Sequence, residues 1–142
     1  MAHFSAWLAS GILQEVFRSG MNIRPTTVAI ALCSGIPQDE NDGGNIPEIA
    51  NAGGYIRWNL GGPSNADWDN VPLGVELTKN SSGIVWPTAT ATWGWVSGIA
   101  LVDSVTYGAG HMLMYGPLST AKFVTTDDIF QINSGSLSLE VR

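Results

Sequence analysis

The sequence contains a single cysteine, Cys33, among its 142 residues, and it has few charged side chains. One cysteine cannot form an internal disulfide, so the fold cannot depend on oxidation. Charged residues make up 13% of the chain, which is about half the share that is usual in soluble domains. A surface that is polar but carries little charge is suited to contact with other proteins.

Basic residues are scarcer than acidic ones, with 6 Lys and Arg against 12 Asp and Glu. The formal net charge of −6 argues against a nucleic-acid groove, because such a groove needs cations to neutralise phosphates. It argues equally against binding to an anionic membrane surface. No apolar run is long enough to span a bilayer, and no basic region precedes an apolar stretch as in a Sec-type signal. We therefore expect no nucleic-acid or membrane partner, and synthesis in a cytoplasm.

The sequence also lacks the common motifs of metal and catalytic sites. His3 and His111 have no partner at ligand spacing, and there is no C-x-x-C, H-E-x-x-H, P-loop, dinucleotide fingerprint or Gly-x-Ser-x-Gly motif. The acidic residues Asp39, Glu40 and Asp42 precede a Gly-Gly pair but do not keep the spacing of a calcium loop, so a solvated turn is favoured. The sequence predicts no catalytic residue, no cofactor and no metal.

Glycine, proline and tryptophan are abundant, with 17 Gly, 7 Pro and 6 Trp. The glycines and prolines fit many tight turns, and tryptophan is favoured in interfaces as well as in cores. Hydrophobic residues make up 44% of the chain, enough for a packed core at this length. The sequence therefore predicts one domain over residues 1–142.

Short apolar or alternating runs, separated by Gly, Pro, Asn and Asp, fill the second half of the chain and are typical of an antiparallel β-sandwich. Long loops are expected at 35–54 and 61–83. The predicted class is all-β, a jelly-roll-like antiparallel β-sandwich with one N-terminal α-helix. Strands are expected at 27–33, 55–60, 84–88, 95–102, 111–117, 122–124, 128–133 and 137–141.

The first predicted strand, 27–33, assigns its side chains to two faces of a sheet. Val28, Ile30 and Leu32 fall on one face, and Ala29, Ala31 and Cys33 fall on the other. Cys33 is therefore predicted to be a small core residue, which is favoured over a reactive thiol.

The helix is predicted over residues 4–19, within the N-terminal segment 1–20. Ser5 is placed to cap its start and Gly20 to follow its end. Packing of its apolar stripe on the edge of the sandwich is favoured over insertion against a neighbouring subunit. The stripe consists of Phe4, Trp7, Leu8, Ile12, Leu13, Val16 and Phe17.

Aromatic and acidic residues leave two alternatives open. Asp67 and Asp69 flank Trp68 and resemble a pair of catalytic carboxylates, although carboxylates two residues apart in a loop more often cap turns. Trp93 and Trp95 fall on one face of an extended strand, which is predicted to be the inner face; an interface or carbohydrate-stacking role is the alternative.

Several motifs follow one another in a family-specific order along nearly the whole chain. With them, the sequence resembles a family of small tailed-bacteriophage virion proteins, whose members are labelled capsid cement (decoration) protein or tail fibre protein. Only the segment 61–79 departs from the family pattern, being longer and richer in Trp and Asp. The motifs are Ile-Leu-Gln-Glu-Val-Phe-Arg at 12–18, Thr-Thr-Val-Ala-Ile-Ala-Leu at 26–32, Gly-Gly-Tyr-Ile-Arg at 53–57, Pro-Thr-Ala-Thr-Ala-Thr-Trp-Gly at 87–94, Gly-His-Met-Leu-Met-Tyr-Gly-Pro-Leu at 110–118, Lys122, and Gly-Ser-Leu-Ser-Leu at 135–139.

The resemblance implies a structural virion protein without enzyme activity, made in the cytoplasm of a bacterial host. Its first implication is a capsid cement (decoration) protein on the capsid surface, which binds between major capsid protein subunits as a homodimer or homotrimer and stabilises the mature head. The first alternative is a tail-fibre or appendage module that contacts the host surface, with glycan stacking on Trp58, Trp68 or Trp86. The second is a small carbohydrate-active enzyme that uses Asp67 and Asp69. The interface is expected at Phe4, Trp7, Leu8, Phe17, Asp39, Glu40, Asp42 and Trp68, and along the loop 37–54.

Overall fold

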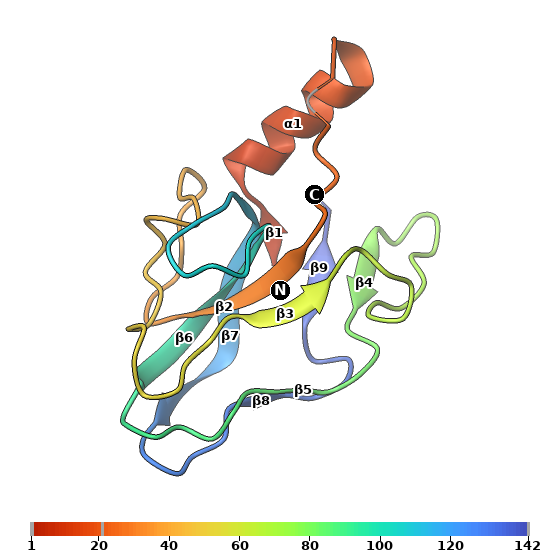
Figure 1. The fold of residues 1–142 in the computed structure, drawn as a ribbon. Helices are drawn as coiled ribbons and strands as arrows, with labels where there is room; N and C mark the ends of the chain where they lie inside the picture. The colour runs from red at the N-terminus through yellow and green to blue at the C-terminus, as the bar shows by residue number, and fades with distance from the viewer. Residues whose placement is uncertain (1, 21, 142) are drawn as a thin grey trace.

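The computed structural model describes residues 2–20 and 22–141, and these contain one α-helix and nine β-strands. The predicted class, an all-β antiparallel β-sandwich with one N-terminal α-helix, is confirmed (Figure 1). The short strand β1 (His3–Phe4) leads into α1 (Ala6–Phe17). The other strands are β2 (Val28–Cys33), β3 (Trp58–Gly61), β4 (Leu77–Lys79), β5 (Ile84–Val85), β6 (Gly94–Val102), β7 (Met112–Val124), β8 (Gln131–Ile132) and β9 (Ser138–Glu140).

One layer of the sandwich is a five-stranded sheet with the strand order β1-β7-β6-β2-β3, in which all neighbouring strands are antiparallel. The long hairpin of β6 and β7 forms its centre. Two two-stranded ribbons, β5-β8 and β4-β9, pack against it. A parallel bridge between Ala2 and Leu139 joins the chain before β1 to β9.

Strand β2 divides its side chains between two cores, as its alternation predicted. Ile30 and Leu32 join the main core, which includes Trp86 and Phe130 on the ribbon side. The opposite face is a second, smaller core of Ala29, Ala31, Cys33, Ile46, Ala100, Val102 and Met112. Small side chains dominate this face because the loop after β2 lies close over the sheet. A Cβ atom on Gly98 would lie 2.6 Å from the carbonyl oxygen of Gly35.

Several elements differ from the prediction. The expected strands 111–117 and 122–124 form one strand, β7. This strand contains a bulge, because Gly98 pairs with Pro117 and Val96 pairs with Lys122, so that β7 has extra residues between these two pairs. Phe4, the first residue of the expected helix, lies in β1 instead, because it pairs with Met114 on β7. Strand β4 lies within the segment 61–83, for which the sequence predicted only irregular structure.

Candidate interaction surfaces

The first turn of α1 is fixed firmly to the sheet. The predicted N-cap is confirmed: the Ser5 hydroxyl accepts the N–H of Leu8 at 3.1 Å and donates to the carbonyl of Met112. Trp7 stacks on His111, with ring centroids 4.3 Å apart and planes 10° apart. Phe4 and Leu8 pack against the main core. The expected interface residues Phe4, Trp7 and Leu8 are therefore half-buried within their own domain.

Beyond this turn, α1 projects away from the sandwich, and the chain returns beside it (Figure 1). Ile23 on the returning segment lies against Gly11, where a Cβ atom would come within 2.4 Å of the Ile23 Cγ2 atom. The Glu15 carboxylate accepts the N–H of Asn22 at 2.9 Å. Gly20 has φ +86°, as expected for a residue that follows a helix end. The returning segment thus covers one side of the helix.

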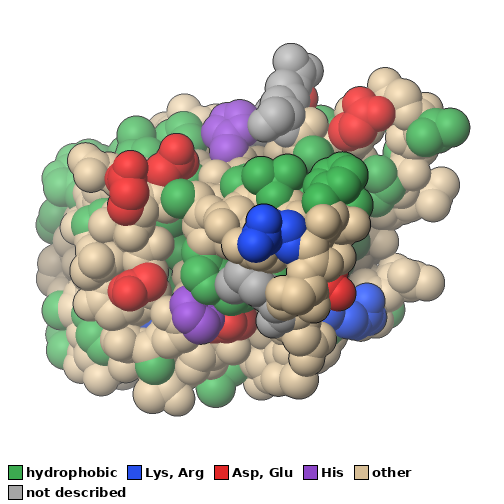
Figure 2. Space-filling model, turned by 90° about the horizontal axis from the view of Figure 1, so that it is seen from above, with side chains coloured by type: hydrophobic (Ala, Val, Ile, Leu, Met, Phe, Trp, Pro, Cys, Tyr) green, Lys and Arg blue, Asp and Glu red, His purple; other side chains and the backbone are tan. Residues whose placement is uncertain are grey.

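The other side of α1 is apolar and open to solvent. Leu13, Val16 and Phe17 are 60%, 63% and 77% exposed, and Ala6 and Ala9 are exposed as well. Packing of the whole stripe on the sandwich edge, the favoured prediction, is therefore wrong for these residues. The apolar residues surround more of the helix than one side can bury. Figure 2, which looks down on this end of the molecule, shows hydrophobic side chains beside a basic one.

The acidic residues lie at the base of this helix. The N–H of Ala6 donates to the carbonyl of Asp39 at 2.9 Å, and the Tyr115 hydroxyl donates to the Asp39 carboxylate. That hydrogen bond raises the pKa of Tyr115 to about 12. Asp42 accepts the N–H of Gly44 at 2.8 Å in a turn. Asp39, Glu40 and Asp42 are all exposed. Among the described residues, no group of three or more His, Cys, Asp or Glu is arranged to hold a metal ion.

The tryptophans proposed for glycan stacking serve mainly the core. Trp86 is 1% exposed, and its indole N–H donates to the carbonyl of Ile56 at 2.9 Å, so a stacking role for Trp86 is wrong. Trp58 lies tilted on Trp86, with centroids 5.9 Å apart. Trp58 and Trp68 are half-buried and pack against the main core.

An exposed aromatic pair lies instead at the far end of β6 and β7. Trp95 is 58% exposed and Phe123 is 46% exposed, and their rings meet edge to face with centroids 5.4 Å apart. The prediction that Trp93 and Trp95 share the inner face is therefore wrong. Gly94 has φ +86°, which breaks the alternation of the strand. Trp93 enters the core, and its indole N–H donates to Gly53 at 2.8 Å.

Asp67 and Asp69 take part in the turns around Trp68. The Asp69 carboxylate accepts the hydroxyl of Ser81 at 2.9 Å, and the Asp69 N–H donates to the carbonyl of Lys79 at 2.8 Å. The carbonyl of Asp67 accepts the N–H of Ser81 at 2.9 Å. These contacts are those of turn residues, the reading that the spacing favoured.

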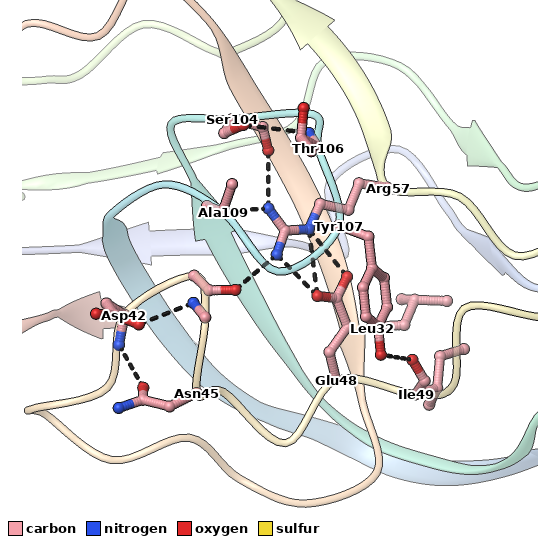
Figure 3. A network of polar contacts seen from close by, with 12 residues as sticks. Leu32, Asp42, Asn45, Glu48, Ile49, Arg57, Ser104, Thr106, Tyr107 and Ala109 are labelled. Carbon is pink, nitrogen blue, oxygen red and sulfur yellow. Dashed lines mark hydrogen bonds and ion pairs between the residues drawn. The ribbon is translucent and has the colours of Figure 1, made fainter.

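A buried ion pair that the sequence did not predict clamps the loops over the sheet (Figure 3). Arg57 is 4% exposed, and its guanidinium donates to the Glu48 carboxylate at 2.8 and 3.0 Å. It also donates to the carbonyls of Gly43, Ser104 and Ala109 at 2.8 to 3.0 Å. One side chain thus joins the loop 35–54 to the loop after β6. The sequence feature that could have indicated this ion pair is the position of Arg57, which comes just before β3 in a domain with few basic residues.

Tyr55 completes this clamp and connects it to β2. Its hydroxyl donates to the Glu48 carboxylate at 2.6 Å and accepts the N–H of Leu32 at 3.0 Å. Burial and the Glu48 charge raise the pKa of Tyr55 well above its usual value. Cys33 lies in the small core nearby, as predicted, and burial raises the pKa of its thiol to about 12. The Gly-Gly-Tyr-Ile-Arg motif is therefore structural, with Gly53 and Gly54 at φ +66° and +82°.

Comparison with known families extends these observations. The family model described as Podophage GP4 fiber I protein gp80 matches residues 3–140, which include α1 and all nine strands. A search of curated proteins found no match.

Proposed function

The chain belongs to the family described as Podophage GP4 fiber I protein gp80, so it is a bacteriophage structural protein, and on this premise we propose that it is a fibre or appendage subunit of the virion. The family match over residues 3–140 is the observation that carries the proposal. The family is described as a fibre protein, and this favours the fibre role over the cement role that the sequence resemblance first implied.

The fold supports such a role because it has exposed apolar surfaces at two distant places. One lies along α1, beside the start of β7, where Ser5 contacts Met112. The other is the Trp95–Phe123 pair at the opposite end of the β6-β7 hairpin. A subunit that attaches at one end and reaches outward at the other requires two such surfaces.

We assign the outward contact to the Trp95–Phe123 pair and propose that it binds sugars of the host surface. Exposed aromatic rings present apolar faces to the C–H groups of a sugar, whereas a buried ring cannot. Thr92 and Thr125, three residues before Trp95 and two residues after Phe123, are exposed, and their hydroxyl oxygens lie 3.1 Å apart at the same end of the hairpin.

Immunogold labelling of intact particles tests the location. An epitope tag inserted at Leu73, which is 103% exposed in its loop, gives the antibody a site outside the two apolar surfaces proposed for contacts. Label at the tail or its tip is the expected result. Label spread over the whole head would replace the fibre role by capsid cement, with the major capsid protein as partner. Particles without any label would overturn both.

The proposed role is not enzymatic, and a glycan-hydrolysis assay on the purified protein tests this point. We expect no release of sugar from host glycans. Hydrolysis by the unmodified protein that disappears in the Asp67→Asn/Asp69→Asn variant would establish the carbohydrate-active enzyme instead.

A further inference from the structure

The apolar side of α1 forms a continuous outer face. With 3.6 residues per turn, Ala6, Ala9, Ser10, Leu13, Val16 and Phe17 fall on one arc about 120° wide, and all of them are exposed. All but Ser10 are apolar, whereas the outward side of a surface helix is normally polar. Positions 6, 9, 13 and 16 follow the spacing of three, four and three residues that forms the seam between paired helices.

No side chain within residues 2–20 and 22–141 buries this outer face. The opposite side of α1 is occupied by the returning segment at Gly11 and Ile23. The first turn is held to β7 through Ser5 and Trp7. The helix has 12 residues, a length that is only marginally stable without tertiary packing. Contact with another molecule would bury Leu13, Val16 and Phe17 and add to the packing of this short helix.

We propose that a second copy of this chain covers the outer face, with the two α1 helices antiparallel about a two-fold axis. The side chains at the base, Ala6 and Ala9, are small, and those toward the tip, Leu13 and Val16, are large. Antiparallel pairing sets Ala6 opposite Val16 and Ala9 opposite Leu13, so that each large side chain meets a small one. A parallel pair would set large against large and leave a gap at the base.

Charge supports the same arrangement. One of the six basic residues, Arg18, is the C-cap at the tip of the helix and is exposed. The base carries exposed Asp39, Glu40 and Asp42, next to Ala6. Since α1 is about 18 Å long, antiparallel pairing brings Arg18 of each copy to the acidic base of the other. Parallel pairing would bring the two copies of Arg18 together. This inference goes beyond the fibre role and does not depend on where the subunit is mounted.

Disulfide cross-linking tests the orientation, because the native Cys33 is fully buried. Equal amounts of the Ala6→Cys and Val16→Cys variants are mixed and oxidised. We expect a covalent dimer in the mixture, because residues 6 and 16 face each other. Val16→Cys alone should not cross-link, because its two copies lie about 15 Å apart along the helix axis, beyond disulfide reach. Ready cross-linking of Val16→Cys alone would instead show parallel helices and overturn the proposal.

Sedimentation of the whole protein tests the interface itself. We expect a dimer whose dissociation constant rises at least about tenfold in Leu13→Asp, the effect of losing one buried apolar side chain. Leu73→Asp, at an exposed leucine outside the face, is the matched control and should leave the dimer unchanged.

A charge exchange tests the contact between tip and base. Arg18→Glu and Glu40→Arg should each weaken the dimer, and the double variant should restore it. A wild-type monomer at tens of micromolar would overturn self-pairing and assign the outer face to another virion protein.

Discussion

At the scale of single residues, the buried pair of Arg57 and Glu48 is the most sensitive contact in the domain. Their side chains are 0% and 4% exposed, and the pair holds two loops over the sheet. In the Glu48→Ala variant the guanidinium stays buried without its counter-charge. We expect the free energy of unfolding to fall by about 3–5 kcal/mol, the usual cost of breaking a buried ion pair from one side. Urea denaturation followed by tryptophan fluorescence measures this change.

Glu76→Gln is the matched control for this prediction, because it removes the charge of an exposed glutamate outside the clamp and the outer face of α1. Its effect should stay within about 0.5 kcal/mol. Equal midpoints for Glu48→Ala and Glu76→Gln would show that the clamp does not hold the fold together.

Cys33 predicts a pH dependence of stability. Burial raises the pKa of its thiol from 9.0 to about 12, so the folded state keeps the proton while the unfolded chain releases it. Stability contributed by the neutral thiol is therefore complete below pH 9 and declines as the pH rises toward 12. The stability advantage of the wild type over Cys33→Ala should shrink across this window. Denaturant titrations of both proteins at pH 8 and pH 11 measure this advantage. If the difference in unfolding free energy between the wild type and Cys33→Ala is the same at both pH values, the raised pKa of the Cys33 thiol is contradicted.

At the scale of secondary-structure elements, the local sequence predicted what local chemistry determines. The alternation in β2 predicted which side chains share each of its two faces, and Ser5 predicted the start of α1. Strands β1 and β4 have two and three residues, and pairing with distant strands produces them rather than their own sequence. Periodicity in α1 marked the apolar residues but not what covers each side. The exposure of Trp95 was missed because Gly94 changes the backbone direction between two tryptophans.

The cap of α1 offers a test at this scale. Ser5 is 0% exposed, accepts the N–H of Leu8 and donates to the carbonyl of Met112. Ser5→Ala removes both contacts at the point where the helix joins the sheet. We expect a loss of about 1–2 kcal/mol in stability and faster hydrogen exchange in the first turn.

Ser10→Ala controls for this change within the same helix. Ser10 is exposed on the outer face, and alanine has the higher helix propensity. Its stability should be equal to or slightly above that of the wild type. A loss in Ser10→Ala as large as that in Ser5→Ala would mean that serine content, and not the cap, determines helix stability.

At the scale of the whole molecule, the fold keeps two exposed surfaces apart. The long hairpin of β6 and β7 runs from the helix end to the Trp95–Phe123 end, and the Arg57 clamp fixes loops across the sheet beside it. Because the two surfaces lie at opposite ends of the β6-β7 hairpin, pairing at α1 would leave the aromatic pairs of both copies free. Self-association and host contact are therefore compatible in one subunit.

A phage that carries Trp95→Ala tests this division of roles. Trp95 is 58% exposed, so its loss should leave folding and particle assembly unchanged. Truncation of a tryptophan that anchors binding typically costs 2 kcal/mol or more, so adsorption to host cells should fall at least about tenfold. Leu73→Ala, another exposed apolar residue, should leave adsorption unchanged. Adsorption kinetics and the heat resistance of filled heads are measured on the same particles. Normal adsorption with less stable heads would contradict the fibre role, since it would place the function of Trp95 on the capsid.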